Sequence, residues 1–275
     1  AQEAAAGFGA AIDVEFVALT HSPIVGSGSE PNQQALRAAI EAGVQLVGGC
    51  PHLELDGPAA IAHALDEAAR AGLAVDLHTD ETLDPTMLTL RDLARQVVDS
   101  GFDRSVTASH CVSLGMQSAD VQAAVAREVA DAGVSIVPLP QTNLFLQGRD
   151  HPTATPRGLT AIGALCEAGV VVAAGADNVQ DPFNLVGRSD PLETAALLVM
   201  AGHVLPDEAY DMVSNNVRRV LGLRPVRFRP GDPADLVAID APSIRGAIAD
   251  APADRKVFKG GRLVASSSSS RTTHL

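Results

Sequence analysis

Short apolar runs recur along this chain at intervals of roughly thirty residues, separated by Ala- and Leu-rich stretches. Most of the runs are apolar almost throughout, as expected for strands of a sheet that is covered on both faces. The Ala- and Leu-rich stretches between them predict helices. We therefore predict strands at residues 14–19, 44–47, 73–77, 105–108, 134–138 and 170–174.

A glycine precedes five of the predicted strands and indicates where each helix ends. Only a residue without Cβ enters the left-handed cap conformation cheaply. These glycines are Gly43, Gly72, Gly101, Gly133 and Gly169, and helix-start signals lie at 30–32, 56–58, 84–85, 118–120 and 190–191. Strand, loop and helix in repetition predict βα units around a parallel sheet. Because no heptad or consensus side-chain repeat accompanies the period, coiled coils and solenoids are excluded.

The composition agrees with a soluble, cytosolic-type enzyme, which predicts a cytoplasmic location. With 275 residues, the chain is long enough for one large barrel or two modest domains. No apolar run approaches the roughly twenty residues of a membrane span, and the N-terminus lacks the basic start of a signal peptide. A net charge of −13 argues against a nucleic-acid surface. We expect no nucleic-acid or membrane partner, while a homo-oligomer is compatible with the sequence.

The cysteines and lysines argue against three other kinds of site. Cys50, Cys111 and Cys166 are isolated, so we expect small buried side chains rather than disulfides or a structural zinc site. The two lysines, Lys256 and Lys259, lie near the C-terminus. The predicted barrel therefore has no lysine for a Schiff base, which disfavours a metal-independent aldolase.

Side chains that can bind a metal or move protons follow three of the predicted strands. His78 and Glu81 come at the end of the third run, His110 at the end of the fourth, and Asp177 just after the sixth. Metal-assisted hydrolysis needs one group that holds the ion and another that moves protons. In a (βα)8 barrel the carboxyl ends of the strands meet at one rim, so we expect these residues to share a site.

At these residues the chain resembles the cytosine-deaminase branch of the amidohydrolase superfamily, and the resemblance runs over most of the chain. Members are α/β proteins, metal-dependent (βα)8 TIM-type barrels with a small flanking β-domain. The motifs that carry the resemblance are PHLE at 51–54, HTDE at 78–81, ASH at 108–110, NLFLQGR at 143–149, PRG at 156–158, GADN at 175–178 and DPFN at 181–184. Segments 230–240 and 257–264 resemble strands of the flanking domain.

The resemblance implies a role for each candidate residue. His78 would bind the metal through an imidazole nitrogen, and Asp177 would bind it while holding the attacking water. Glu81 would carry a proton from that water to the ring nitrogen and then to the leaving amine, and His110 would hydrogen-bond the attacking oxygen. One divalent ion is implied, and these ligands suit zinc and iron alike. The implied enzyme is a hydrolase of non-peptide carbon–nitrogen bonds that deaminates a cytosine-like or related nitrogen heterocycle.

One feature of the superfamily is missing from the sequence. Its barrels begin with a His-x-His pair, and no two of the eight histidines here are separated by a single residue. With about six βα units present, we expect the chain to start before the third barrel strand, about a hundred residues into the family pattern. We predict a partial barrel over residues 1–225, part of the flanking β-domain over 226–265, and a disordered tail over 266–275.

The substrate is less constrained than the reaction. The Gln that hydrogen-bonds the pyrimidine in bacterial cytosine deaminases would fall near His21, and an imidazole cannot reproduce the paired donor and acceptor of an amide. The family's Trp is Phe183 here, which keeps an apolar wall but loses the indole donor. Gln147 is retained. We assign these three residues to substrate binding.

Other functions remain compatible with the sequence. A close variant would hydrolyse another exocyclic amine or a cyclic amide, as triazine- or creatinine-type relatives do. A non-catalytic barrel would serve as a binding or assembly subunit, and a degenerate relative would lack metal. Bound metal separates these possibilities, because the hydrolase needs about one tightly held divalent ion.

Overall fold

Five parallel strands form the central sheet of the computed structural model, which describes residues 2–270 and 272–274. Neighbours in the sheet are also neighbours in sequence, and every pair is parallel. The strands are β1 (Val17–Ala18), β2 (Leu46–Gly49), β3 (Ala74–Thr79), β4 (Val106–His110) and β5 (Ser135–Val137). This order, with helices in the connections, confirms the predicted βα units.

The sixth predicted strand lies beside β5 but is not a full strand. It makes one parallel bridge, between Val172 and Ile136. Groups from the helical segment that follows take its other backbone positions: Ala174 N–H donates to Met212 O at 2.8 Å, and Asn216 Nδ2 donates to Val172 O at 2.8 Å. The predicted position is right, whereas the regular strand is shorter than predicted. On the β5 side, Ile136 N–H donates to Val171 O and Ala173 N–H to Ile136 O, so the contacts with Met212 and Asn216 lie on the opposite edge of the run.

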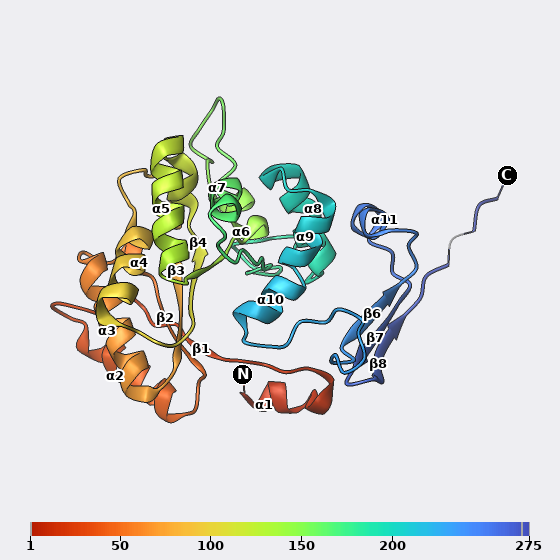
Figure 1. Ribbon diagram of the computed structural model, residues 1–275, viewed down its shortest axis with the longest axis horizontal. Helices are drawn as coiled ribbons and strands as arrows, with labels where there is room; N and C mark the ends of the chain where they lie inside the picture. The colour runs from red at the N-terminus through yellow and green to blue at the C-terminus, as the bar shows by residue number, and fades with distance from the viewer. Residues whose placement is uncertain (1, 271, 275) are drawn as a thin grey trace.

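Helices cover the sheet in chain order (Figure 1). In the view, α2 to α5 lie on one side of β3 and β4, and α6 to α10 lie on the other side. Among the described residues, none of the helices is long and apolar enough to cross a bilayer. The helices are α1 (Gln2–Ala6), α2 (Glu30–Glu41), α3 (Gly57–Ala71), α4 (Thr89–Ser100), α5 (Ala119–Asp131), α6 (Pro140–Leu146), α7 (Ile162–Glu167), α8 (Pro191–Gly202), α9 (Pro206–Met212), α10 (Asn215–Val220) and α11 (Ile244–Asp250), with 3₁₀ turns η1 (Gly9–Ala11), η2 (Pro51–Leu53) and η3 (Val112–Met116).

The helix ends follow the glycine pattern, while one predicted helix start is wrong. Gly72 and Gly101 are left-handed C-caps with φ of 68° and 65°. The helix expected from residues 84–85 begins instead at Thr89. The carboxylate of Asp84 is occupied in a local turn, where it accepts a hydrogen bond from the N–H two residues ahead. The Asp84–Pro85 pair therefore forms a turn before α4 and is not the start of the helix.

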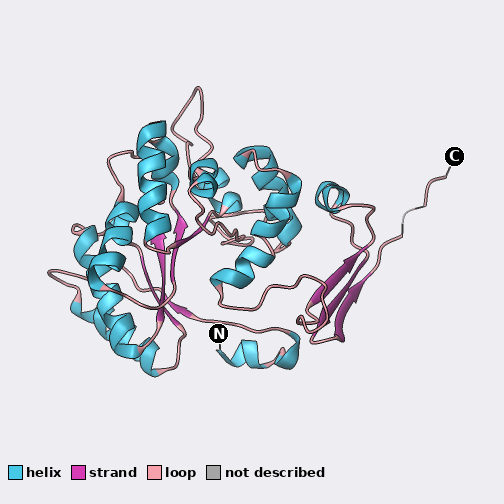
Figure 2. Ribbon diagram, viewed as in Figure 1, coloured by secondary structure: helices cyan, strands magenta, loops and turns pink. Residues whose placement is uncertain are grey.

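A second, antiparallel sheet lies near the C-terminus, in the order β6 (Leu236–Ile239), β7 (Arg255–Lys259) and β8 (Arg262–Ser267) (Figure 2). Arg255 joins it to α8 through an ion pair with Asp190, at 2.8 Å between Nη2 and Oδ2. The predicted tail is wrong for Ser266 and Ser267, because β8 pairing with β7 continues through them. Residues 271 and 275 of that predicted tail lie outside the described residues, and the division at 225–226 stays a prediction.

Candidate active site

The register of β3 and β4 brings two histidines together at the carboxyl end of the sheet. His78 pairs with Ser109, and the next pair along is Thr79 with His110. His78 Nδ1 lies 3.0 Å from His110 Nε2, with ring centroids 4.8 Å apart. The His110 side chain is only 1% exposed. Parallel pairing thus places the two predicted histidines in direct contact.

The chain turns sharply at each strand end that carries a candidate residue. Asp80, His110 and Asp177 adopt φ of 52°, 65° and 61°, in the left-handed region. This conformation costs a non-glycine residue roughly 1–2 kcal/mol, and such residues cluster at functional sites. Here each one stands beside or within the group of predicted functional residues.

Asp80 is a structural anchor that sequence reasoning did not identify. Its carboxylate is fully buried and accepts hydrogen bonds from Thr89 N–H at 2.8 Å, Thr89 Oγ1 at 2.6 Å and Leu90 N–H at 2.9 Å. It therefore caps α4 from nine residues away while it sits between His78 and Glu81. Thr89 at the start of the helix was the only sequence signal of this cap. Known capping patterns join residues three apart, whereas Asp80 and Thr89 are nine apart.

Glu81 is poised to exchange protons near neutral pH. Its side chain is 21% exposed, and Oε2 lies 3.5 Å from His110 Nε2. Burial, followed by the negative charge of Asp177, raises the pKa of Glu81 to about 7. The Asp177 side chain is 18% exposed, with Oδ2 3.9 Å from the same nitrogen, and burial raises its pKa as well.

His110 is neutral at ordinary pH. Burial and the neighbouring His78 lower the pKa of its ring to about 3. Its contacts with the Glu81 and Asp177 carboxylates are therefore contacts of a neutral imidazole rather than ion pairs. On the other side of the ring, Nδ1 lies 3.1 Å from Nδ2 of Asn143, at the start of α6.

His52 supports the end of β3 from the neighbouring loop. Its Nδ1 lies 3.0 Å from the His78 carbonyl oxygen. As a carbonyl oxygen only accepts, Nδ1 carries the proton. Burial lowers the pKa of His52. The contact secures the backbone of the residue that was predicted to bind metal.

The residues present fit a divalent metal ion. His78, Glu81 and His110 each offer a ligand atom, and all three atoms lie within 4.8 Å of one another. Ligands of one tetrahedral zinc ion are about 3.4 Å apart, given bonds of about 2.1 Å. Imidazole nitrogens and carboxylate oxygens are also the donor types that zinc and iron accept. The predicted ligand Asp177 adjoins this group through its contact with His110.

Of the three predicted substrate residues, Gln147 reaches the cluster. Its Nε2 donates to the Glu81 carbonyl oxygen at 3.3 Å. Phe183 is 53% exposed, in a loop held by a hydrogen bond from its N–H to Asp181 Oδ1 at 2.9 Å. His21 is exposed beyond the end of β1. Within the described part of the chain, no hydrogen bond or ion pair joins these two to the cluster, and their roles stay predictions.

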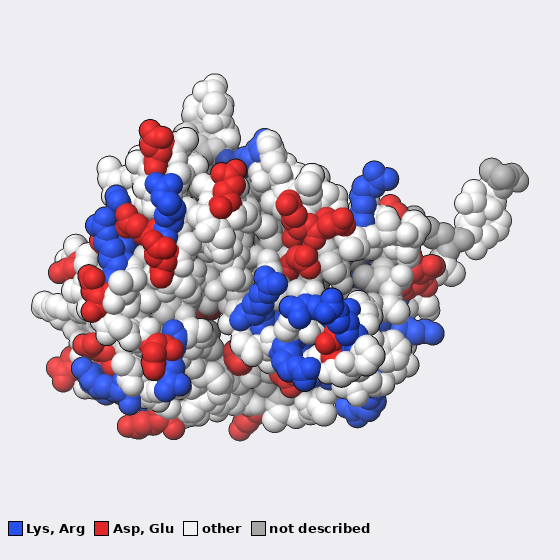
Figure 3. Space-filling view, viewed as in Figure 1, with Lys and Arg blue, Asp and Glu red and all other residues white. Residues whose placement is uncertain are grey.

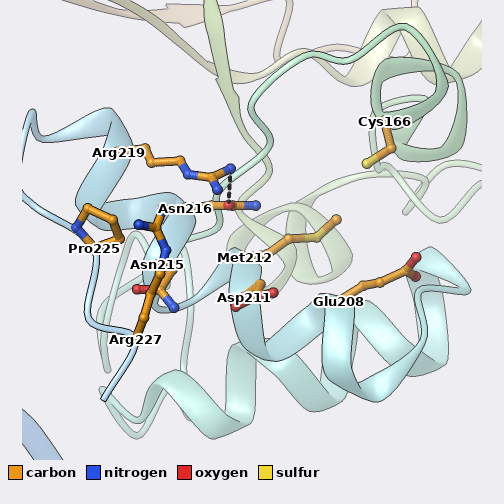
Figure 4. Close-up of a pocket in the computed structure, with 9 residues that line it drawn as sticks. All are labelled: Cys166, Glu208, Asp211, Met212, Asn215, Asn216, Arg219, Pro225 and Arg227. Atoms are coloured by element: carbon orange, nitrogen blue, oxygen red, sulfur yellow. Dashed lines mark hydrogen bonds between the residues drawn. The ribbon is translucent and has the colours of Figure 1, made fainter. Parts of the chain in front are cut away.

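Two of the cavities outside this cluster have volumes of about 400 and 510 Å³. One of about 400 Å³ is lined by residues of both charges, among them Arg219 and Asp211, and by none of the predicted site residues (Figure 4). Cys166, expected to be buried, is exposed and lines it. Arginines gather over α10 and the segment after it (Figure 3). The other cavity, of about 510 Å³, lies between the loops after β1 and β2, on the carboxyl side of the sheet.

Comparisons with known proteins agree on the family. Residues 9–265 match the amidohydrolase family. Pterin deaminase from Rhizobium rhizogenes is 40% identical over 225 residues, which make up 80% of this chain and 51% of that protein. The chain thus spans about half the length of this curated relative.

Solved structures are similar over nearly the whole chain. A 5-methylcytosine deaminase from Klebsiella pneumoniae, liganded with 5-fluorocytosine, has a TM-score of 0.87 and 27% identity, covering 99% of this chain and 67% of that one. N-isopropylammelide isopropylaminohydrolase from Burkholderia multivorans has a TM-score of 0.79 and 25% identity, covering 97% of this chain and 66% of that one. The expected α/β barrel class is confirmed by this likeness.

Proposed function

The chain belongs to the amidohydrolase family, and on that premise we propose that it is a hydrolytic deaminase of a small nitrogen heterocycle. One observation carries the proposal. His78, Glu81, His110 and Asp177 meet at the carboxyl ends of parallel strands, where barrels of this class assemble their active sites. Two of the similar proteins are deaminases by name, which supports the same reaction class.

The chemistry follows from the protonation states of the cluster. His78 and Asp177 would hold one divalent ion, zinc or iron, which supplies a water of lowered pKa when bound. Glu81, with a pKa of about 7, would accept a proton from the attacking water and deliver protons to the ring nitrogen and the leaving amine. The water oxygen adds to the amine-bearing carbon, the carbon–nitrogen bond breaks, and ammonia leaves.

Neutral His110 complements this proton transfer. A ring that carries one proton can donate a hydrogen bond to the oxygen that becomes negative as it attacks. A positively charged imidazolium would instead bind the substrate and the transition state more tightly to the same extent, which does not accelerate the chemical step. Burial of the ring, which holds its pKa near 3, maintains this state across the physiological range.

We propose a pyrimidine-type ring, single or fused, as the substrate. The Nε2 of Gln147 is held by the Glu81 carbonyl oxygen, which leaves Oε1 free to accept from a ring N–H. His21 and Phe183 would face the remote side of the ring from the loops after β1 and the sixth run. The name of the pterin deaminase supports a fused ring, and that of the 5-methylcytosine deaminase supports a single ring.

A second candidate is removal of a substituted amine. The structural likeness to N-isopropylammelide isopropylaminohydrolase supports it, at 25% identity over 97% of this chain. The same residues would catalyse both reactions, because Glu81 would protonate an alkylamine as readily as an unsubstituted one. The two candidates differ in the leaving group that the pocket accepts.

The test is a substrate panel with metal analysis alongside. The protein, loaded with zinc or iron, is assayed for ammonia and alkylamine release from cytosine, 5-methylcytosine, pterin and N-isopropylammelide. Ammonia from the first three supports the deaminase, and isopropylamine supports the second candidate. Absence of amine from all four would overturn the proposal.

A variant pair assigns the proton transfer. Glu81→Gln should abolish turnover while metal content is unchanged, since the amide keeps the shape but cannot shuttle protons. Glu128→Gln is the matched control, because Glu128 pairs with Arg91 and Arg95 on the outer helices. Turnover by Glu81→Gln at the level of this control would refute the role of Glu81.

A further inference from the structure

The strand register places Cys50 beside His78. The last pair between the parallel strands β2 and β3 is Gly49 with Leu77. Cys50 follows directly, so the same register puts it opposite His78, one residue beyond the end of β2. Its φ of −125° continues the extended chain. Because successive side chains of a strand alternate between faces, the Cys50 side chain lies on the His78 face of the sheet.

That face is the one on which the proposed reacting groups meet. Leu77 and Thr79, the alternate residues of β3, are 1% and 0% exposed and point to the opposite face. Cys50 itself is half-buried. Burial, followed by the negative charges of Glu81 and Glu54, raises the pKa of its thiol to about 11. The thiol is therefore close enough to Glu81 to experience the charge of that carboxylate.

Cys50 is not part of the group that could hold the metal ion. Among the residues that the structure describes, that group comprises His78, Glu81 and His110. The segment after Cys50 is fixed against β3, because His52 Nδ1 lies 3.0 Å from the His78 carbonyl oxygen. A free cysteine packs as a small, weakly polar side chain. Cys50 thus offers a fixed surface for a substrate ring beside the proposed ligands.

A cavity lies a short distance beyond Cys50. Cys50 is the N-cap of η2, and Leu53 at the end of η2 lines the cavity of about 510 Å³ between the loops after β1 and β2. At a 3₁₀ rise of about 2 Å per residue, Leu53 lies roughly 6 Å along the turn from Cys50. The opposite wall begins at Ser22, next to His21, which was predicted to bind substrate. Both walls of the cavity therefore start beside the candidate site.

We propose that Cys50 is a specificity-determining residue whose small side chain admits heterocycles of two fused rings. The inference rests on the proposed function, because it names the ring class that the same site accepts. A ring held over the metal group has the end of β2 at its flank, and a second ring extends past Cys50 toward the cavity. A larger side chain at residue 50 would occupy that space, whereas a single ring needs less of it.

The ratio of two specificity constants tests the proposal. With zinc-loaded protein, kcat/KM is measured for ammonia release from pterin, which has two fused rings, and from cytosine, which has one. Cys50→Leu adds bulk to the proposed wall, so the pterin-to-cytosine ratio should fall by about tenfold or more. Cys50→Ser keeps the size of the side chain, and its ratio should stay within about threefold of the native value. An unchanged ratio in Cys50→Leu, or native protein that acts on cytosine but not on pterin, would overturn the proposal.

Cys166→Leu is the matched control. It makes the same substitution at an exposed cysteine that lines the other cavity, of about 400 Å³. The pterin-to-cytosine ratio of this variant should match that of the native protein. An equal fall in both leucine variants would show a general loss of packing and would also count against Cys50. Cys50→Val adds less bulk, and its ratio should fall in the same direction if Cys50→Leu does not fold.

A binding measurement separates this proposal from the proposed function. Pterin is fluorescent, so its Kd is measured by titration in the zinc-loaded Glu81→Gln background, and competition gives the Kd of cytosine. Cys50→Leu in that background should weaken pterin binding by about tenfold relative to cytosine. If native protein releases no ammonia although pterin binds, the proposed deaminase is refuted and the two Kd values still decide the role of Cys50. Binding of neither heterocycle would overturn both proposals.

Discussion

The buried carboxylate of Asp80 should contribute far more to stability than an ordinary helix cap. Asp80→Asn keeps one acceptor oxygen and replaces the other with an NH₂ group. Of the three hydrogen bonds from Thr89 and Leu90, at least one donor then faces another donor. A buried donor without an acceptor costs about 1–3 kcal/mol. Loss of the negative charge at the N-terminus of α4 adds roughly 0.3–1 kcal/mol.

These contributions sum to a loss of about 3 kcal/mol in the free energy of unfolding. At roughly 2–4 °C per kcal/mol for a chain of about this size, Tm should fall by about 6–12 °C. Asp56→Asn is the matched control. Asp56 is an exposed N-cap of α3 with one hydrogen bond, from Ala59 N–H at 3.0 Å. Asn is an equally good cap, so the control should stay within about 0.5 kcal/mol of the native protein.

Urea unfolding followed by far-UV circular dichroism measures both variants, with m-values compared to confirm that the same surface unfolds. An Asp80→Asn protein as stable as Asp56→Asn would refute the reasoning. It would mean that the three donors find other partners or water once the carboxylate is gone.

Further predictions concern glycines, an ion pair and the metal. Gly163→Ala should raise stability by about 0.5–1 kcal/mol, because its Cβ would meet nothing within 4 Å in α7. Gly115→Ala should destabilise the protein, since its Cβ would lie 2.1 Å from the Leu159 carbonyl oxygen, and thermal melts compare the two. Burial opposes the charge of Asp190, but hydrogen bonds, chiefly from Arg255, outweigh it and lower its pKa. The stability advantage of native protein over Asp190→Asn should therefore be complete above about pH 5 and shrink as the pH falls below the ordinary Asp pKa of about 4. Urea unfolding at several pH values measures this difference, and an advantage that persists at low pH would contradict it. Dialysis against a chelator should abolish amine release, and about one equivalent of zinc or iron should restore it; activity without metal would exclude the metal-dependent route.

The parallel sheet was predictable because its signals are local. Gly72 and Gly101 end their helices because glycine adopts the left-handed backbone conformation whatever its surroundings. The apolar runs that follow them are recognised from their own residues, without reference to a distant segment. The run at 170–174 shows the limit. It makes only one bridge to β5, and the backbone groups on its other edge bond to Met212 and Asn216, which are about forty residues away.

The sequence predicted which residues would form the candidate site. It did not predict the contacts that hold their side chains in place. His78, Glu81, His110 and Asp177 stand at strand ends, which periodicity locates, and the structure brings them together. Asn143 was visible only as one letter of a motif. Its contact with His110 joins β4 to α6. Such a contact between distant elements cannot be predicted from the spacing of residues within one segment of the sequence.

The bond between Asp80 and the start of α4 also limits how this protein can evolve. Four consecutive positions hold the proposed ligand His78, a strand-end residue, the helix cap Asp80 and the proposed base Glu81, and the cap must reach Thr89 and Leu90. An insertion or deletion within residues 78–90 would shift the base and unseat the helix together, so we expect length variation among homologues to concentrate in other loops. Anyone who grafts this turn onto another barrel must therefore transfer residues 78–90 together.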